Sequence, residues 1–511
     1  MAAVGIHLGS TSASLALHKD GRTEILTNDA GDRVTPALVA CLGKEKSIGL
    51  PAKHGLIRNS KNTMARAFKI VGLRFSADVV QEEVQISDCK IVCKDGEPTF
   101  EVVVNEKPRF FSPKDVVRMI FQKLLEIAQA NGGNDIEDAV ITVPLHFSDE
   151  QRVAMREAAE DAGFNVLRVI SQPSAAALAY DIGQSDRTVV RMVVVYRLGG
   201  TSLDVTVLAI SGGMYRVVAT DNDTSIGGVK FDKLLAQHLA AEFQRQWKQD
   251  ITGNGRAMAK LLAGAESCKH VLSSRDTATC AIESLYDGID LNSKVTRARF
   301  ESLCLSLFQQ TLKTIDRVLA KSNITKDNVD QVILVGGSTR IPRIQQLLQE
   351  YFVSKEVLQS ISPDGVLAYG AAIQATFLLG KGERTNDDLE EVECTSKAIS
   401  VMLEEANLPM RQIIPKYTPI PLRRTHNFTT SLDKQETVCL CVYEVDEDDS
   451  CDRGKTLLAK VVLADIPPMA KGEAIIVGTF HIRRRREDGS LHIHLVEKTS
   501  EKSADISIDA S

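Results

Sequence analysis

Two glycine turns, each following an apolar run typical of a buried strand, could bind phosphate groups. They lie in "VGIHLGSTSASLAL" (residues 4–17) and "VVVYRLGGTSLDV" (residues 193–205). Glycine lets the backbone approach an anion closely, so that consecutive N–H groups converge on it, and hydroxyl groups add further donors. The residues that this chemistry would use are Gly9, Ser10, Thr11, Gly199, Gly200, Thr201 and Ser202.

The two stretches are also similar to each other. Both contain an apolar run, Leu-Gly, one small residue and Thr-Ser, and a third strand-to-glycine turn, "VILVGGSTRIP", spans residues 332–342. Repeated units of this kind predict a duplicated α/β domain, with turns from both halves facing one site. Arg197 ends the second apolar run, where phosphate chemistry usually needs a carboxylate to hold a metal ion.

Helical and strand patterns surround these turns up to about Gly380. Residues 113–130 have apolar side chains at helical spacing after Pro113, and residues 148–164 begin at Ser148 with a helix-start signal. This alternation of strands and helices predicts an α/β domain with mixed sheets.

The region after residue 380 has a different pattern. Residues 381–397 contain few apolar residues and are typical of a linker. Beyond them, "TVCLCVYEV", "KVVLADI" and "GSLHIHLVEK" alternate with period two, and Asp488-Gly489 is typical of a hairpin turn. A run of strands with no convincing long helix predicts a compact β-sandwich.

Composition excludes several classes of protein. The chain has 511 residues, 43% hydrophobic and 25% charged, with a net charge of -6, as in a globular protein that does not wrap nucleic acid. Its 10 cysteines lack paired metal-ligand spacing and are interpreted as buried free thiols. We expect neither a secretory signal nor a membrane-spanning run, and therefore a cytosolic location.

Longer stretches resemble the seventy-kilodalton heat-shock (DnaK-type) chaperone family. They include "NDAGDRVTPALVA", "VITVPLHFSDEQR", "SLYDGIDLNSKVTRARFE" and "SPDGVLAYGAAIQA", and the resemblance covers essentially the whole chain. It implies an actin-like, two-lobed nucleotide-binding domain (residues 1–382), an acidic linker (383–396) and a peptide-binding-type β-sandwich (397–511). The family's adenosine-contact positions are matched here by Glu266, Lys269, Ser273, Gly337, Ser338, Arg340 and Asp364, whereas His270 replaces an expected arginine.

Departures from the family pattern fall on the catalytic positions. The family has aspartates where this chain has His7 and Arg197, and a lysine where it has Phe68. The family's glutamate is replaced by Gln172, and a third glycine by Thr201.

Of the acids expected around the metal and the attacking water, only Asp204 remains, and Lys69 lies one residue away from the lysine position. Because phosphoryl transfer depends on placed charges, we predict little or no ATPase activity. We predict no protein metal ligands, and ATP or ADP bound without tightly held magnesium.

Three alternatives remain open. In one, Arg197 pairs with Asp204 and the scaffold binds no nucleotide. In the second, the chain is an active ATPase stimulated by a J-protein, with Lys69, Asp204 or a partner residue supplying the missing groups. The third is a sugar kinase on the same scaffold.

The resemblance also suggests partners. The linker offers only Leu389 and Val392 among acidic and amide residues, and the chain stops before the family's helical lid, as in a truncated, ribosome-associated branch. That branch pairs stably with a zuotin-type J-protein and assists nascent polypeptides in the cytosol; a role in the stress response follows from the family. Ribosomal RNA contact is an alternative role for Arg483, Arg484, Arg485 and Arg486, and residues 444–452 are expected to form an acidic loop.

Overall fold

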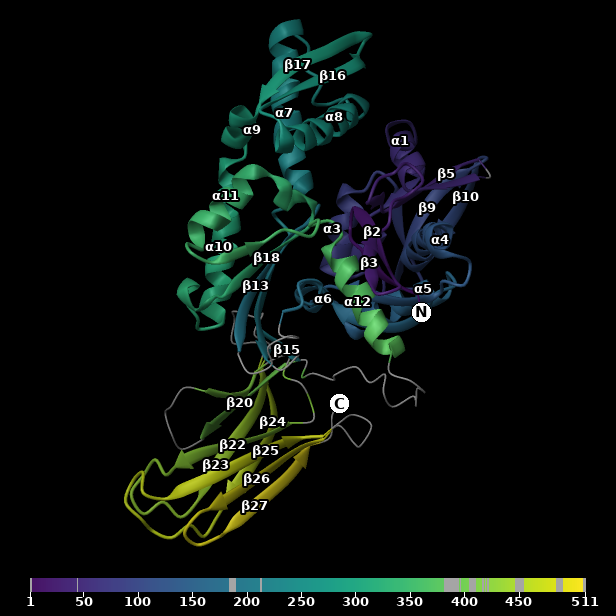
Figure 1. The fold of residues 1–511 in the computed structure, drawn as a ribbon. Helices are drawn as coiled ribbons and strands as arrows, with labels where there is room; N and C mark the ends of the chain where they lie inside the picture. The colour runs from purple at the N-terminus through teal and green to yellow at the C-terminus, as the bar shows by residue number, and fades with distance from the viewer. Residues whose placement is uncertain are drawn as a thin grey trace. The chain divides into compact units, whose positions relative to one another are not determined.

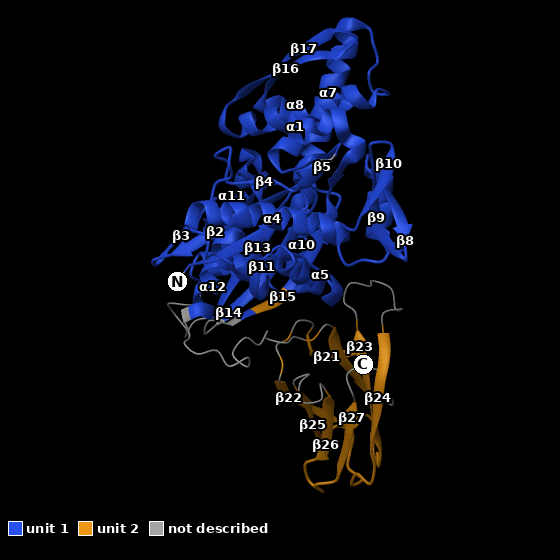
Figure 2. Ribbon diagram, turned by 90° about the vertical axis from the view of Figure 1, so that its right-hand side faces the viewer, with its two compact units in different colours: residues 1–215, 219–384 blue, residues 216–218, 385–511 orange. Residues whose placement is uncertain are grey.

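The structure is a computed structural model of the 511-residue chain. It describes residues 2–43, 45–182, 190–211, 214–380, 395, 397–403, 410–415, 418, 420, 422–445, 455–483 and 490–508. The chain divides into two compact units, shown in blue and orange in Figure 2: residues 1–215 with 219–384, and residues 216–218 with 385–511. The linker segment 383–394, Asp488-Gly489, residues 446–452 and Arg484–Arg486 lie outside the described residues.

The first sheet of unit 1 is built around the first glycine turn. Its strand order is β12 (Asn165–Ser171), β11 (Asp138–Val143), β1 (Ala3–Leu8), β2 (Ser12–Lys19) and β3 (Arg22–Ile25), and β4 (Thr35–Pro36) pairs with β2. Strand β1 runs parallel to β11 and antiparallel to β2. Nearly every residue of β1 and most residues of β2 are buried, so this sheet lies in the core of the unit with both faces covered.

The second sheet repeats the same connections. Its order is β15 (Met214–Asp223), β14 (Leu203–Ser211), β13 (Arg191–Leu198), β18 (Gln331–Val335) and β19 (Glu356–Leu358). Strand β13 is antiparallel to β14 and parallel to β18, as β1 is to β2 and β11. The predicted duplication of an α/β domain is therefore confirmed.

Helices cover these sheets at the positions that the sequence indicates. Helix α4 (Pro113–Gly132) and α5 (Asp149–Glu160) have capping boxes at Ser112 and Ser148. Helix α12 (Val366–Gly380) packs on β1, β2 and α6 (Gln172–Ala179), and Figure 1 shows it alongside the first sheet. Gly5 permits this contact, because a Cβ there would lie 2.1 Å from the carbonyl oxygen of Ala368.

A helical subdomain follows the second sheet. Helices α7 (Gly228–Trp247) and α8 (Gly255–Ser274) pack on each other, and α8 also packs on the hairpin of β16 (Thr277–Tyr286) and β17 (Ile289–Thr296). The remaining elements of unit 1 are β5 (Leu38–Leu42), β6 (Glu45–Ile48), α1 (Leu50–Asn59), η1 (Ser60–Asn62), β7 (Thr63–Ala65), α2 (Ala67–Ile70), α3 (Asp78–Ile86), β8 (Lys90–Lys94), β9 (Glu97–Val104), β10 (Lys107–Phe111), α9 (Arg297–Leu303), α10 (Leu305–Lys321), η2 (Lys326–Asn328), η3 (Gly337–Arg340), α11 (Pro342–Tyr351).

Unit 2 is the predicted β-sandwich. One sheet has the order β21 (Arg411–Ile414), β20 (Ala398–Leu403), β23 (Val438–Val445), β24 (Lys455–Leu463); the other has β22 (Leu422–Thr429), β25 (Ile475–Ile482), β26 (Leu491–Glu497), β27 (Ser503–Ile508). Apolar residues from both sheets, including Val442 and Phe480, form one buried cluster. In the described part of residues 397–508, every element is a strand.

Candidate functional site

The two predicted phosphate turns have the same backbone geometry. In the first, the Gly9 N–H donates to the carbonyl of Ser12 at 2.8 Å, and in the second, the Gly199 N–H donates to the carbonyl of Ser202 at 2.9 Å. Each bond closes the hairpin between the first two strands of its sheet. The similarity of the two sequences thus reflects two copies of one turn.

The turns also lie against each other within unit 1. A Cβ on Gly200 would come 2.4 Å from Oγ1 of Thr11, so only glycine leaves room for the other turn. Four N–H groups have no hydrogen-bond partner among the described residues: those of Ser10, Thr11, Gly200 and Thr201. Free N–H groups on two facing turns are the donor set that a chain of phosphates requires.

Arg197 and Asp204 form an ion pair at the second turn. They occupy paired positions on β13 and β14, and Nη1 of Arg197 donates to Oδ2 of Asp204 at 2.5 Å. Their side chains are only 11% and 15% exposed. The Ser202 hydroxyl donates to the same carboxylate oxygen at 3.1 Å. The acid that survives at the catalytic positions is therefore neutralised by the cation beside it.

Two further side chains complete the surroundings of Asp204. Nδ2 of Asn222 donates to Oδ1 at 2.6 Å, and Nδ1 of His146 lies 3.7 Å from the same oxygen. Burial alone would raise the pKa of Asp204, but Arg197, His146 and Asn222 outweigh it and hold that pKa below its ordinary value. Burial lowers the pKa of His146, although Asp204 opposes this effect.

His7 is the penultimate residue of β1, the equivalent strand of the first half. Its Nδ1 lies 3.0 Å from Oγ1 of Thr142, the residue paired with it on β11. Burial, together with the charge of Arg197, lowers the pKa of His7 to about 3, so the ring is neutral at physiological pH. A Cβ on Gly9 would lie 3.4 Å from Nε2, which places the ring against the glycine turn.

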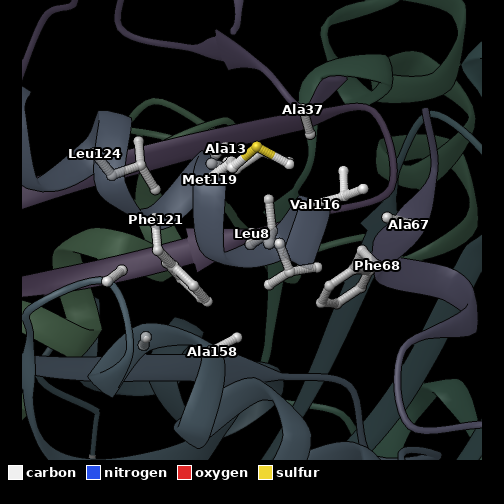
Figure 3. Packing of buried hydrophobic residues seen from close by; sticks show 14 of the residues in the cluster. Leu8, Ala13, Ala37, Ala67, Phe68, Val116, Met119, Phe121, Leu124 and Ala158 are labelled. Carbon is white, nitrogen blue, oxygen red and sulfur yellow. The ribbon is translucent and has the colours of Figure 1, made fainter. Parts of the chain in front are cut away.

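Phe68 is part of the hydrophobic core, and Lys69 is held elsewhere. The Phe68 ring belongs to the buried cluster that contains Leu8 (Figure 3). It packs on Phe147 with ring centroids 4.9 Å apart. Lys69 pairs with Glu83 at 2.7 Å, and Arg66 pairs with the other oxygen of the same carboxylate at 2.7 Å. Lys69 is therefore engaged in a largely buried ion-pair network with Glu83 and Arg66.

Gln172 is the first residue of α6 and is 2% exposed. Its Nε2 has no hydrogen-bond partner among the described residues. An unsatisfied buried amide costs free energy unless a ligand or a water accepts its proton. The position therefore offers a hydrogen-bond donor where the family resemblance implies a carboxylate.

The adenosine-type positions on α8 make charged contacts. Oε1 of Glu266 lies 2.8 Å from Nζ of Lys53, which α1 contributes. Lys269 is buried and pairs with Asp232 at 2.8 Å, where burial raises the Asp232 pKa to about 6 against the influence of Lys269. Ser273 donates to the carbonyl of Lys269 in its own helix at 3.0 Å.

The third turn adjoins the second. Gly336 has φ of 89°, and a Cβ there would lie 2.4 Å from the carbonyl oxygen of Leu198, so the position requires glycine. Ser338 donates to the carbonyl of Gly199 at 3.1 Å. Gly337 and Arg340 both face Asp364: a Cβ on Gly337 would lie 2.4 Å from its Oδ1, and Nε of Arg340 donates to its Oδ2 at 2.7 Å.

The donor set fits phosphate and does not fit a divalent cation. Among the residues that the structure describes, no group of three His, Cys, Asp or Glu side chains is arranged to hold a metal ion. Magnesium prefers carboxylate and water oxygens, whereas Asp204 is already paired with Arg197. An anion can accept hydrogen bonds from three kinds of donor here: the unpaired N–H groups of the turns, the Gln172 amide and the Arg197 guanidinium.

The fold and these turns define a class of protein. A duplicated, two-lobed α/β domain with paired phosphate-type turns is the architecture of an actin-like nucleotide-binding domain, and an all-β sandwich follows it in the chain. The family model for Hsp70 protein matches residues 3–511, so this chain belongs to the Hsp70 family of nucleotide-binding chaperones.

Curated relatives are similar over their whole lengths. Heat shock 70 kDa protein 14-B of Xenopus laevis is 45% identical over 100% of this chain and 99% of its own length. Heat shock 70 kDa protein 14 of Homo sapiens is 43% identical over 100% of this chain and 99% of its own, and that of Bos taurus is 42% identical over 100% of both.

Several residues of the site were not found by sequence reasoning. Glu83 lies on α3, Asn222 on β15 and His146 in the loop between β11 and α5, and Lys53 reaches Glu266 from 213 positions away. The signal that the sequence offered for one of them is Lys69, a charged residue one position away from the expected lysine, whose ion-pair partner is Glu83.

In the part of the chain that the structure describes, no helix combines the length and the apolar character that crossing a membrane needs.

Proposed function

We propose that this chain is an atypical Hsp70-type chaperone subunit that binds ATP or ADP and hydrolyses ATP slowly or not at all. The observation that carries the proposal is the ion pair between Arg197 and Asp204. A carboxylate paired with a guanidinium can neither order the water shell of a magnesium ion nor polarise an attacking water. The same guanidinium supplies a fixed positive charge to phosphate oxygens.

Binding of the nucleotide rests on the three turns and α8. The free N–H groups at Ser10, Thr11, Gly200 and Thr201 would bind phosphate oxygens, and Arg197 would neutralise part of their charge. Glu266, Lys269, Ser273, Arg340 and Asp364 stand where the family resemblance implies adenosine contacts. Magnesium, when bound, would screen phosphate charge; here Arg197 performs that role, so we propose that nucleotide binds without a tightly held metal.

Loss of turnover follows from three separate positions. His7 is neutral and hydrogen-bonded to Thr142, the Phe68 ring is packed in the core, and Gln172 carries no charge. The absence of each preorganised charged group lowers the rate of hydrolysis by about 10²–10³, and the effects of several absences do not simply add. Losing even one or two of them makes hydrolysis too slow to drive a chaperone cycle.

The proposed setting is a ribosome-associated complex in the cytosol, in which the chain forms a stable heterodimer with a zuotin-type J-protein and assists the folding of nascent polypeptides. Support comes from the full-length similarity to relatives named heat shock 70 kDa protein 14 and from a catalytic site that cannot itself drive a cycle. Contact with ribosomal RNA through residues 483–486 remains part of this proposal; only Arg483 lies in the described part of the chain.

Single-turnover hydrolysis of radiolabelled ATP by the purified chain, with and without the J-protein, tests turnover. We expect no stimulated release of phosphate. A matched variant restores the family residues at all four substituted positions (His7→Asp, Phe68→Lys, Gln172→Glu and Arg197→Asp) and is expected to gain magnesium-dependent hydrolysis. Turnover at a family-like rate by the unmodified chain would contradict the proposal.

Calorimetric titration of ATP in EDTA tests binding. Arg197→Met is expected to weaken metal-free binding about tenfold, as loss of one charge-assisted contact does. Arg343→Met is the control, because the Arg343 guanidinium pairs with Glu350 on its own helix α11. If the unmodified chain binds ATP neither in EDTA nor in magnesium, the alternative of a scaffold that binds no nucleotide is favoured instead. The Arg197–Asp204 ion pair also supports that alternative.

In the alternative of an active ATPase, Lys69, Asp204 or a residue of a partner supplies the missing catalytic groups. Glu83→Gln releases Lys69 from its carboxylate, and Asp204→Asn removes the acid. If hydrolysis is observed and Asp204→Asn abolishes it, the alternative is correct. If hydrolysis persists unchanged in that variant, it comes from a contaminating enzyme.

A further inference from the structure

Two cysteines outside the phosphate turns lie side by side in the core of unit 1. Cys268 belongs to α8 and Cys280 to β16, and their thiols are in hydrogen-bond contact, with Cys280 donating to Cys268. Both are free thiols, 3% and 2% exposed. The contact joins the helix to the edge of the β16–β17 hairpin, and Figure 1 shows α8 beside β16.

A glycine on the same helix face allows this approach. Gly264 precedes Cys268 by four residues, one turn of the helix. A Cβ on Gly264 would lie 3.0 Å from Sγ of Cys280 and 2.8 Å from Cδ1 of Ile282. The missing side chain thus leaves the strand close enough to the helix for the two sulfur atoms to meet.

The chemistry of the two thiols differs. The hydrogen bond that Cys268 accepts lowers its pKa, against the effect of burial, whereas the same bond and burial raise the pKa of Cys280. Cys268 is therefore the sulfur that ionises more easily, and thiolates are the form that oxidants attack. Cys280 retains its proton and is placed to react second.

We propose that Cys268 and Cys280 form a reversible intramolecular disulfide when the chain meets a peroxide, and that this bond fixes α8 to β16. The balanced reaction has two steps. The Cys268 thiolate attacks hydrogen peroxide, forming an S–O bond, breaking the O–O bond and releasing hydroxide, which takes up a proton to become water. The Cys280 sulfur then displaces the hydroxyl group of the sulfenic acid, forming the S–S bond and a second water. The peroxide is reduced and the two thiols are oxidised.

The position of the bond connects it to the nucleotide site. Cys268 lies between Glu266 and Lys269 on α8, which carry the charged contacts to Lys53 and Asp232. An S–S bond of about 2.05 Å is shorter than any contact between two thiols, so its formation must rotate the two side chains or draw α8 toward β16. This consequence rests on the proposed function, whereas formation of the disulfide does not.

A second pair of buried cysteines provides the control within the same molecule. Cys41 and Cys89 are also buried, and the charge of Cys41 contributes to raising the pKa of Cys89. Burial raises the pKa of both, and no hydrogen bond between their thiols is among the causes. Cys41 and Cys89 are therefore buried like the proposed pair, but they lack the thiol–thiol hydrogen bond that joins Cys268 and Cys280.

The full-length chain is treated with hydrogen peroxide, alkylated, digested and analysed by mass spectrometry. We expect a Cys268–Cys280 crosslinked peptide that dithiothreitol cleaves, loss of two titratable thiols, and no Cys41–Cys89 peptide. Cys268→Ser and Cys280→Ser each abolish the crosslink. Gly264→Ala, which leaves both thiols in place, is expected to lower the rate of crosslinking, because its Cβ displaces Cys280; its circular dichroism reports whether it remains folded.

Two outcomes overturn the proposal. One is oxidation of Cys268 to a sulfinic acid with Cys280 still reduced, and the other is a crosslink that joins either residue to Cys304 or Cys41 instead. ATP binding of the oxidised chain is measured separately by calorimetry. Unchanged affinity after verified crosslinking would remove the link to nucleotide binding and leave the disulfide itself established, whereas absence of ATP binding before oxidation would contradict only the proposed function.

Discussion

The two halves of unit 1 have the same turn and different strand-end chemistry. His7 and Arg197 are the penultimate residues of β1 and β13, two residues before the first glycine of each turn. His7 stands between Ser14 on β2 and Thr142 on β11, both uncharged, and hydrogen-bonds to Thr142. Arg197 stands between Asp204 on β14 and Val335 on β18, and pairs with the acid.

The difference shows which features of a phosphate site are separable. Backbone geometry comes from the hairpin bond of Gly9 or Gly199 and is the same in both halves. Charge comes from the strand-end side chain and its cross-strand neighbour, and it can change while the turn is retained. A binding surface can therefore persist after the groups needed for hydrolysis have been replaced.

The largest expected effect comes from breaking the charged pair of the second half. Arg197→Met leaves Asp204 buried beside Asn222 and without its cation, which should lower the free energy of unfolding by about 3 kcal/mol. Urea unfolding followed by circular dichroism measures the change. Adding Asp204→Leu should recover most of the loss, because two apolar residues replace a desolvated pair; a double variant as unstable as the single would show that the pair is not the cause.

A smaller effect is expected from exchanging the turns. Gly200→Ser gives the second turn the residue of the first, but its Cβ would lie 2.4 Å from Thr11, and overpacking of this kind costs about 2 kcal/mol. Ser10→Gly, the reverse exchange, should cost under about 1 kcal/mol. Thermal unfolding of both variants, and of Gly200→Ser with Thr11→Ala, tests this; equal destabilisation by the two exchanges would indicate that the turns do not meet.

The neutral half is tested by pH. The pKa of His7 is about 3 in the folded chain and near 6.5 when unfolded, so the unfolded state binds a proton first. Stability should therefore fall as pH decreases from 6.5 toward 3. Asp204, whose folded pKa is depressed, begins to lose its contribution only as pH falls past the ordinary aspartate pKa of about 4, so most of the His7 window lies above it.

His7→Gln should cost about 1 kcal/mol at neutral pH through the weaker bond to Thr142. It should also flatten the decline in stability between pH 6.5 and 4, measured by urea midpoints at each pH. Other histidines with lowered pKa remain in both chains, so the difference between the two curves reports His7 alone. Parallel curves would show that folding does not lower the pKa of His7.

The smallest expected effect is at His146. Its side chain is 51% exposed and lies 3.7 Å from Asp204, so His146→Ala should change the free energy of unfolding by less than about 0.5 kcal/mol. Chemical-shift titration of the ring should give a pKa below the ordinary histidine value and a rise in that pKa in Arg197→Met, where a nearby positive charge is removed. If the pKa of His146 is the same in both chains, the charge of Arg197 does not act on His146.

Much of the architecture was predictable because it depends on local patterns. The helices that begin at Pro113 and Asp149, the strands β23, β24 and β26 of unit 2 and the internal repeat follow from periodicity, caps and glycine turns. The family resemblance was carried by motifs spread along the chain, and the family model confirms it. The assigned roles of the site residues remain predictions, since they depend on a ligand.

The sequence by itself determined which residues occupy the two turns and which catalytic groups are replaced, because residue identity sets charge and hydrogen-bonding capacity. Only the tertiary structure decided how those residues are used. His7 bonds to Thr142 across 135 positions, Lys69 is captured by Glu83, and Cys268 meets Cys280 over a glycine. Such choices depend on which strands and helices pack together, and a side chain's partner is fixed by that packing rather than by its neighbours along the chain.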